Sequence, residues 1–190
     1  QALFFRLQDD SASACAQLSA CLTLAEQWAG VSQEPAAVPC MEESVLSFLR
    51  SCEVLTSDWK QMLEQAANAP EPENLLAYTP ALDQEIRLFT MDMLYRYYLR
   101  AAYAETPEAE ILPVQMAAFA VCIVLLYSRR LGFHTAEQRL RIWQLFVKEI
   151  EYDGDNLEEL EWQLETNAAF SPTAFRTYFA SPGKSEAKRS

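Results

Sequence analysis

Glycine is scarce in this chain, and its scarcity limits the fold class. Only four glycines occur in 190 residues, at Gly30, Gly132, Gly154 and Gly183. A sheet protein of this size normally places more glycines at its turns. The chain is 51% hydrophobic, enough to form a core, and its abundant Ala, Leu, Glu and Gln favour helices. The composition therefore predicts an all-α protein with no sheet.

The common catalytic motifs are missing as well. The sequence contains no HExxH, no GxSxG, no phosphate-binding glycine loop and no glycine-rich loop of the Rossmann type. Its one histidine, His134, lies at an expected helix start, with no nucleophile and orienting carboxylate together beside it. We interpret His134 as a loop or capping residue. The sequence thus assigns no catalytic residue.

Clustered cysteines are also lacking. The five cysteines are scattered and form no CxxC pair: Cys15, Cys21, Cys40, Cys52 and Cys122. Zinc and iron–sulfur sites need clustered thiolates, so we expect no metal or cofactor site in this segment. Reduced, mostly buried thiols are typical of a cytoplasmic protein, which is the location we expect.

Basic residues are outnumbered by acidic ones. There are 15 Lys and Arg against 27 Asp and Glu, which gives a net charge of −12. Nucleic acids and anionic membranes bind clusters of Lys and Arg, so we expect neither as a partner. The apolar stretch 114–127 is shorter than the ~20 residues of a membrane span and contains Gln115. A helix apolar on all sides is typical of the centre of a bundle.

Apolar residues repeat at helical spacing between clear start and stop signals. Thr79-Pro80, Ser171-Pro172 and a capping box from Thr135 to Gln138 start helices, and Gly30 and Gly132 end them. We expect further caps at Asp10 or Ser11, at Ser57, and in the box Asp155 to Glu158, and a start at Thr106-Pro107. The expected helices cover about 12–29, 41–52, 57–66, 80–103, 107–131, 136–151, 155–168 and 172–179.

These helices predict an irregular bundle of about seven or eight helices. We expect one domain over residues 1–180, with a possible subdivision near 67–78 and a disordered tail at 181–190. The chain starts at Gln1 and enters the apolar stretch Leu3-Phe4-Phe5 with no signal peptide. We therefore expect a piece of a longer protein.

Two polar clusters are candidates for binding. The first combines tyrosine and arginine on the helix 80–103: Tyr95, Arg96, Tyr97, Tyr98, Arg100 and Tyr103. Tyrosine has an apolar body and a polar tip, and Arg96 can stack on such rings. The cluster fits packing between helices, and it also fits a face that lines a ligand or a partner.

The second cluster is acidic and surrounds Gly154: Glu149, Glu151, Asp153, Asp155, Glu158, Glu159 and Glu161. It lacks the residue order of a calcium-binding loop. Acidic residues at the start of a helix complement the helix dipole, so a solvated acidic turn is one interpretation. A docking surface for a basic or lysine-bearing partner is the other.

Three segments resemble the C-terminal helical region of the flagellin lysine-N-methylase family. Leu49–Trp59 (LRSCEVLTSDW) is similar to the family's Leu-Glu-Val-Leu…Trp segment. Tyr95–Tyr103 (YRYYLRAAY) is similar to its Tyr-Arg-Tyr-Phe-x-Lys-Ala-Val-Phe block. Lys148–Glu158 (KEIEYDGDNLE) is similar to its Lys/Arg-Glu-Ile-Glu-His-Ser-Glu-Glu-Asn-Leu-Glu block. Order and spacing agree over about residues 45–170.

The resemblance implies transfer of a methyl group from S-adenosylmethionine to lysine ε-amines of a surface protein such as flagellin. The family's N-terminal part carries a cysteine-rich stretch associated with an iron–sulfur cluster. Cys15, Cys21 and Cys40 do not match the spacing of that stretch, and Tyr152 stands where the family has a histidine. The resemblance therefore implies a helical domain that is inactive alone and acts with a missing N-terminal part.

We expect this domain to help form the substrate or cofactor cleft. The residues expected to line it are Tyr95, Arg96, Tyr97, Glu149 and Glu151. Acidic side chains there would attract the lysine of the substrate. Two alternatives remain open, a non-catalytic helical interaction or scaffold module and an enzyme that uses another pocket within the bundle.

Overall fold

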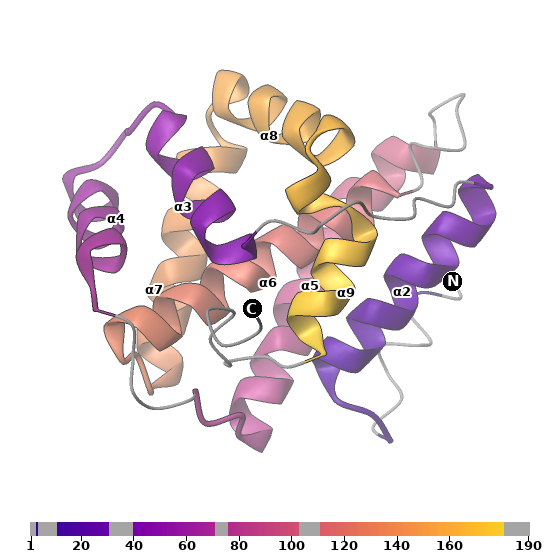
Figure 1. The fold of residues 1–190 in the computed structure, drawn as a ribbon, viewed down its shortest axis with the longest axis horizontal. Helices are drawn as coiled ribbons and strands as arrows, with labels where there is room; N and C mark the ends of the chain where they lie inside the picture. The colour runs from indigo at the N-terminus through magenta and orange to yellow at the C-terminus, as the bar shows by residue number, and fades with distance from the viewer. Residues whose placement is uncertain (1–2, 4–10, 31–39, 71–75, 103–110, 181–190) are drawn as a thin grey trace.

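The structure is a computed structural model that describes residues 3, 11–30, 40–70, 76–102 and 111–180 (Figure 1). This part of the chain contains eight α-helices and no strand, which confirms the all-α prediction. The α-helices are α2 (Ala14–Ala29), α3 (Met41–Ser51), α4 (Ser57–Asn68), α5 (Pro80–Ala102), α6 (Leu112–Leu131), α7 (Ala136–Phe146), α8 (Gly154–Thr166) and α9 (Pro172–Phe179). A π-helix, η2 (Val147–Glu151), follows α7, and a 3₁₀ turn, η3 (Ala168–Phe170), precedes α9.

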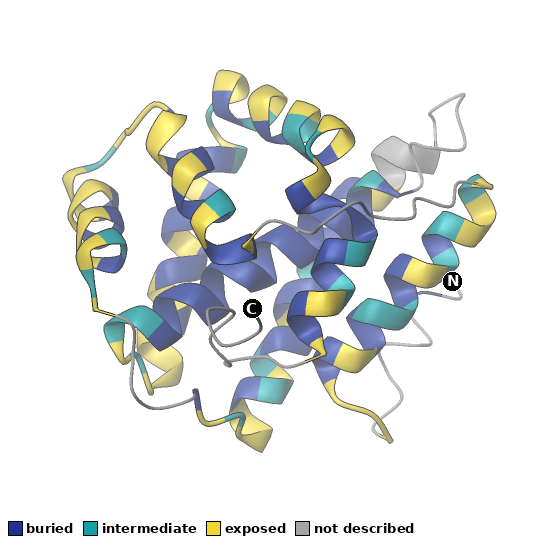
Figure 2. Ribbon diagram, viewed as in Figure 1, coloured by how far each residue is buried: buried dark blue, intermediate teal, exposed yellow. Residues whose placement is uncertain are grey.

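Helix α6 is the centre of the bundle, as predicted from its apolar sequence. Each of the other seven described α-helices packs against it. Figure 2 shows it as an almost continuous buried rod, and every residue from Pro113 to Arg129 is buried. The apolar stretch 114–127 was expected to be too short for a membrane span, but α6 as a whole has 20 residues and is long and apolar enough to cross a membrane. Since 94% of its apolar window is buried among the other helices, it has the surroundings of a core helix.

Most of the predicted helix ends are confirmed. Gly30 and Gly132 end α2 and α6 with φ of 67° and 66°, a left-handed conformation that glycine adopts without strain. Thr135 and Gln138 form the predicted capping box at the start of α7. Ser171 caps α9 directly before Pro172. Thr106-Pro107, residues 71–75 of the possible subdivision near 67–78, and the tail 181–190 lie outside the described residues.

Three predicted caps were wrong by one to three residues. Ser13, Thr56 and Asp153 cap α2, α4 and α8, each with an extended backbone and a side-chain oxygen that accepts a backbone N–H of the first turn. The capping residue must be the last one before the helical backbone begins. Several neighbouring residues of suitable type precede each helix, so composition alone did not choose among them.

The π-helix was not predicted. The sequence suggested one continuous helix over 136–151, but the last five residues, Val147–Glu151, wind into a wider turn. Such π-bulges occur frequently at functional sites. Val147, Glu149 and Ile150 are buried in this turn, so the wider winding directs Glu149 into the protein.

Buried ion pairs tie the outer helices to the centre. Glu42 of α3 accepts a hydrogen bond of 2.9 Å from Nε of Arg129 in α6 and a second one from Nη2. Arg130 lies 3.4 Å from the same carboxylate, and the Tyr178 hydroxyl of α9 donates to it at 3.3 Å. One carboxylate thus joins α3, α6 and α9.

Candidate functional site

The three segments that carry the resemblance meet at the π-helix. Glu149 of η2 accepts a hydrogen bond from the backbone N–H of Leu55 at 2.7 Å and a longer one from that of Thr56. The Thr56 hydroxyl donates to the other carboxylate oxygen. Glu149 therefore places a negative charge at the N-terminus of α4, where backbone N–H groups lack partners.

Asn156 of α8 forms hydrogen bonds to the same two segments. Its Oδ1 accepts the backbone N–H of Glu53 at 2.8 Å, and its Nδ2 donates to the carbonyls of Glu53 and Glu149, both at 2.8 Å. We call the cluster of Glu53, Leu55, Thr56, Glu149 and Asn156 the junction. Hydrogen bonds among these five residues join the first and third segments of the resemblance.

Arg96 connects the second segment to the π-helix. Its guanidinium lies 2.5 Å from Glu151 and 2.9 Å from Asp92, one turn earlier on α5. The side chain of Arg96 is 38% exposed, whereas that of Glu151 is only 6% exposed. Arg96 thus forms ion pairs with two carboxylates at this end of the site.

Glu151 is only half satisfied. Its Oε2 binds Arg96, but its Oε1 is buried and has no hydrogen-bond partner among the described residues. Burial raises the pKa of the Glu151 carboxyl above its ordinary value, and the nearby Arg96 opposes part of that rise. A buried carboxylate oxygen without a donor is unfavourable, so this position favours an additional donor or a proton.

The five residues expected to line a cleft lie in different surroundings. Tyr95 is 71% exposed and Arg96 half-exposed, so both face outward, whereas Tyr97 is buried in the core. Glu149, expected on an exposed acidic turn, is instead fully buried and engaged in the junction. Glu149 therefore holds the fold together at this point, and Tyr95, Arg96 and Glu151 are the members of the set that lie near the surface or keep an unsatisfied atom.

The other singled-out residues have clear positions. His134 is exposed, and its backbone N–H donates to Oε1 of Gln138 at 3.0 Å as part of the capping arrangement. This position agrees with a capping or loop role. Arg100 and Tyr103 fall among residues whose side chains the structure does not describe.

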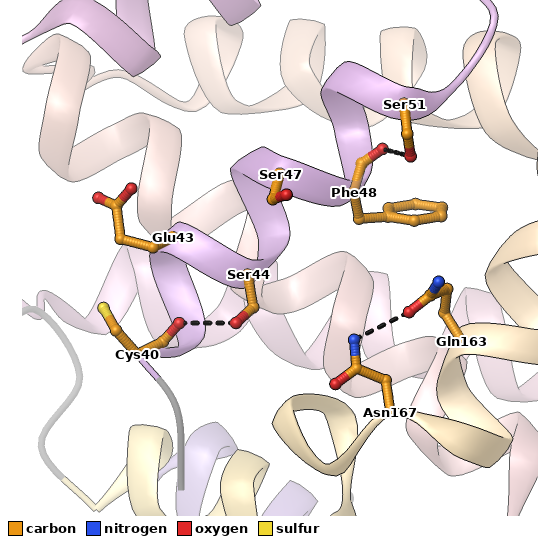
Figure 3. A pocket seen from close by; sticks show the side chains of 8 residues that line it. All are labelled: Cys40, Glu43, Ser44, Ser47, Phe48, Ser51, Gln163 and Asn167. Atoms are coloured by element: carbon orange, nitrogen blue, oxygen red, sulfur yellow. Dashed lines mark hydrogen bonds between the residues drawn. The ribbon is translucent and has the colours of Figure 1, made fainter.

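A second candidate site is a groove between α3 and α8. It has a volume of about 450 Å³ and is lined by Cys40, Glu43, Ser44, Ser47, Phe48, Ser51, Gln163 and Asn167 (Figure 3). Both helices rest on α6. This α3–α8 groove was not predicted. Its only signal in the sequence is the spacing of Ser44, Ser47 and Ser51 along one face of α3.

The cysteines do not form a cluster site. Within the described part of the chain, no group of three or more His, Cys, Asp or Glu side chains could hold a metal ion. Burial raises the pKa of Cys15 and of Cys52 to about 12, so both thiols keep their protons at neutral pH.

No protein-family model, curated protein or solved structure matches this chain.

Proposed function

We propose that this chain is the C-terminal helical domain of a protein-lysine N-methyltransferase similar to flagellin lysine-N-methylase. In this proposal the domain packs against a cysteine-rich part that carries the iron–sulfur cluster. It contributes one wall of the cleft that receives the substrate lysine, and it has no activity alone. S-adenosylmethionine supplies the methyl group when the two parts act together.

The observation that carries the proposal is the meeting of the three resembling segments. They lie far apart in the sequence, yet Glu149 and Asn156 bind residues 53–56, and Arg96 binds Glu151. Chance similarities in a helical protein would be scattered over its surface. Three segments that form one hydrogen-bonded unit are more consistent with a shared tertiary arrangement.

The outward side of this unit provides the wall of the proposed cleft. Tyr95 directly precedes Arg96 in the sequence, and Tyr152 directly follows Glu151. The two tyrosine side chains are 71% and 79% exposed. Aromatic faces and carboxylates both attract a lysine ammonium group. Tyr152 occupies the position of the family's histidine, so it would supply an aromatic face there in place of an imidazole.

The test combines the 190-residue chain with a cysteine-rich N-terminal part of a lysine-N-methylase, S-adenosylmethionine and flagellin. Mass spectrometry then counts the methyl groups on flagellin lysines. We expect methylation only when both parts are present. Methylation that is unchanged when the helical chain is omitted would contradict the proposal.

A point variant locates the wall within this assay. Tyr95→Ala removes a ring that is 71% exposed, so it should lower methylation without changing the stability of the chain. Trp28→Ala on α2, where the ring is 46% exposed, is the matched control and should keep full activity. Equal activity of both variants would place the wall elsewhere.

A non-catalytic interaction module is the second candidate. It is favoured by the number of large apolar side chains that are about half exposed or more, including Leu88, Tyr95, Leu140, Tyr152 and Trp162. A scaffold would bind its partner without S-adenosylmethionine and without the cysteine-rich part. Stable binding of flagellin by the chain alone, with no methylation in the combined assay, would favour this candidate.

A further inference from the structure

The α3–α8 groove is a cavity with two different walls. Figure 3 shows the serines and Phe48 of α3 on one side, and Gln163 and Asn167 from the end of α8 on the other. Its volume of about 450 Å³ lies within the range of ~300–1,000 Å³ found for small-molecule sites. The groove belongs to neither the junction nor the Arg96–Glu151 pair.

The α3 wall offers acceptors. The Ser44 hydroxyl donates its proton to the carbonyl of Cys40 at 2.9 Å, and the Ser51 hydroxyl donates to the carbonyl of Phe48 at 2.7 Å (Figure 3). A hydroxyl has one proton and two lone pairs. Both oxygens are therefore left with lone pairs for a donor in the groove, and neither has a proton to offer an acceptor.

Some of the hydrogen-bond donors of the α8 wall are already paired with acceptors of the same wall. Asn167 donates to the side-chain oxygen of Gln163 at 2.8 Å, and Gln163 donates to Glu159 at 3.1 Å. Each amide keeps one further N–H group. The lining as a whole is richer in acceptors than in donors, and it includes the Glu43 carboxylate.

Among the residues that line the groove, the charged one is Glu43, whose Oε1 accepts a hydrogen bond from Arg130. The positive N-terminal end of α3 is already complemented by Glu42 and Glu43 in its first turn. The adjacent Arg129 and Arg130 are paired with these two glutamates. The chain as a whole carries a charge of −12, which raises the local concentration of cations near its surface.

The floor of the groove is apolar. Phe48 is 5% exposed, and its ring packs edge-on against Phe119 at 5.4 Å between centroids. A flexible hydrocarbon stem can lie along such a ring while its charged end reaches polar groups at the rim.

We propose that the α3–α8 groove binds a lysine side chain of a polypeptide, with its stem over Phe48 and its ammonium group among the serine oxygens and Glu43. The identification of the amine as a substrate lysine rests on the proposed function, whereas the acceptor-rich lining favours a primary alkylammonium independently. The groove would hold a lysine that flanks the methylated one and so position the polypeptide.

The test titrates the ¹⁵N-labelled chain with a short peptide, acetyl-Gly-Lys-Gly-amide, and follows the amide resonances by NMR. Two matched peptides replace lysine by norleucine or by glutamate. We expect shifts centred on Ser47, Phe48, Gln163 and Asn167 with the lysine peptide. The norleucine peptide should bind about tenfold or more weakly, because it keeps the stem and loses the charge.

A variant fills the groove with an amine of its own. Ser47 is exposed, so Ser47→Lys should fold normally and reduce binding of the lysine peptide by about tenfold or more. Gln61→Lys adds the same charge at an exposed position on α4 and should leave binding unchanged. Equal binding of the norleucine or glutamate peptide, or full binding by the Ser47→Lys variant, would overturn the proposal.

The two proposals fail in different ways. Loss of methylation in the combined assay, with lysine-peptide shifts intact in the chain alone, would remove the methyltransferase function and keep the groove as an ammonium site. Methylation with no peptide shifts in the groove would keep the function and remove the groove.

Discussion

Two buried glutamates of this protein differ in how fully they are satisfied. Glu42, between α3, α6 and α9, receives hydrogen bonds from Arg129 and from the Tyr178 hydroxyl and lies against Arg130. Glu151, at the end of the π-helix, receives one from Arg96, and its second oxygen is buried without a donor in the part of the chain that the structure describes. Both side chains are no more than 6% exposed.

The difference separates a structural charge from a candidate functional one. A buried charge that stabilises a fold must have all of its oxygens satisfied, since each unsatisfied one costs free energy. Glu42 meets that condition and Glu151 does not. The incomplete carboxylate of Glu151 is the one whose neighbour in the sequence, Tyr152, and whose partner's neighbour, Tyr95, are exposed, and it belongs to the wall of the cleft in the proposed function.

The largest predicted effect is the loss of Glu42. Glu42→Ala removes the buried carboxylate that forms the ion pair with Arg129 between α3 and α6, so the free energy of unfolding should fall by about 3–5 kcal/mol. Urea denaturation followed by circular dichroism measures this change. Its neighbour Glu43 has a side chain that is 64% exposed, and Glu43→Ala should cost about 1 kcal/mol or less. Equal effects of the two variants would contradict the structural role of Glu42.

Glu149 should rank second. Glu149→Ala removes the acceptor for Leu55 and Thr56, and we expect a loss of about 1–3 kcal/mol in the free energy of unfolding. The exposed neighbour Glu158 on α8 serves as the control, with no measurable change expected for Glu158→Ala. Hydrogen exchange should also show faster opening at the start of α4 in the Glu149 variant. Unchanged hydrogen exchange at the start of α4 would show that Glu149 does not stabilise that helix end.

Arg96 should matter less for stability. Arg96→Ala leaves the Glu151 carboxyl, whose side chain is 6% exposed, without its arginine, and should lower the free energy of unfolding by about 1–2 kcal/mol at neutral pH. This is less than for Glu42→Ala, because the Glu151 carboxyl, with its raised pKa, can take up a proton instead of remaining a buried charge. The same urea titration measures it. A loss as large as that of Glu42→Ala would mean that both glutamates are structural, and the contrast between them would disappear.

The smallest effect concerns the pH dependence of stability. Because the pKa of Glu151 is raised in the folded protein, the folded state takes up a proton at a higher pH than the unfolded chain does. This group's contribution to stability is therefore fully present below the ordinary pKa of 4.5 and is lost as pH rises through the folded-state pKa.

Glu151→Gln removes this titration. The difference in free energy of unfolding between the variant and the unmodified protein should therefore move in the variant's favour as pH rises above 4.5. Urea titrations at several pH values measure that difference. A difference that is constant with pH would show that the Glu151 carboxyl titrates normally, which would remove the electrostatic contrast with Glu42.

Local signals in the sequence determined the fold class and most of the helix ends. The stops at Gly30 and Gly132 and the capping box at Thr135 depend on residues within one turn of the helix end. Such short-range backbone preferences are visible in a few consecutive residues. The apolar run of α6 likewise predicted a central helix, since no other placement within a bundle covers a helix that is apolar on all sides.

Only the tertiary structure decided the site. Glu149 and Leu55 are 94 positions apart, and no local pattern indicates that a π-turn directs that carboxylate inward to cap α4. The groove likewise depends on how α3 and α8 rest on α6. Residue types and spacing along one helix determine which face is polar. The partners of a polar side chain depend on packing between distant segments, which is why Glu149 became a structural residue and Glu151 kept an unsatisfied oxygen.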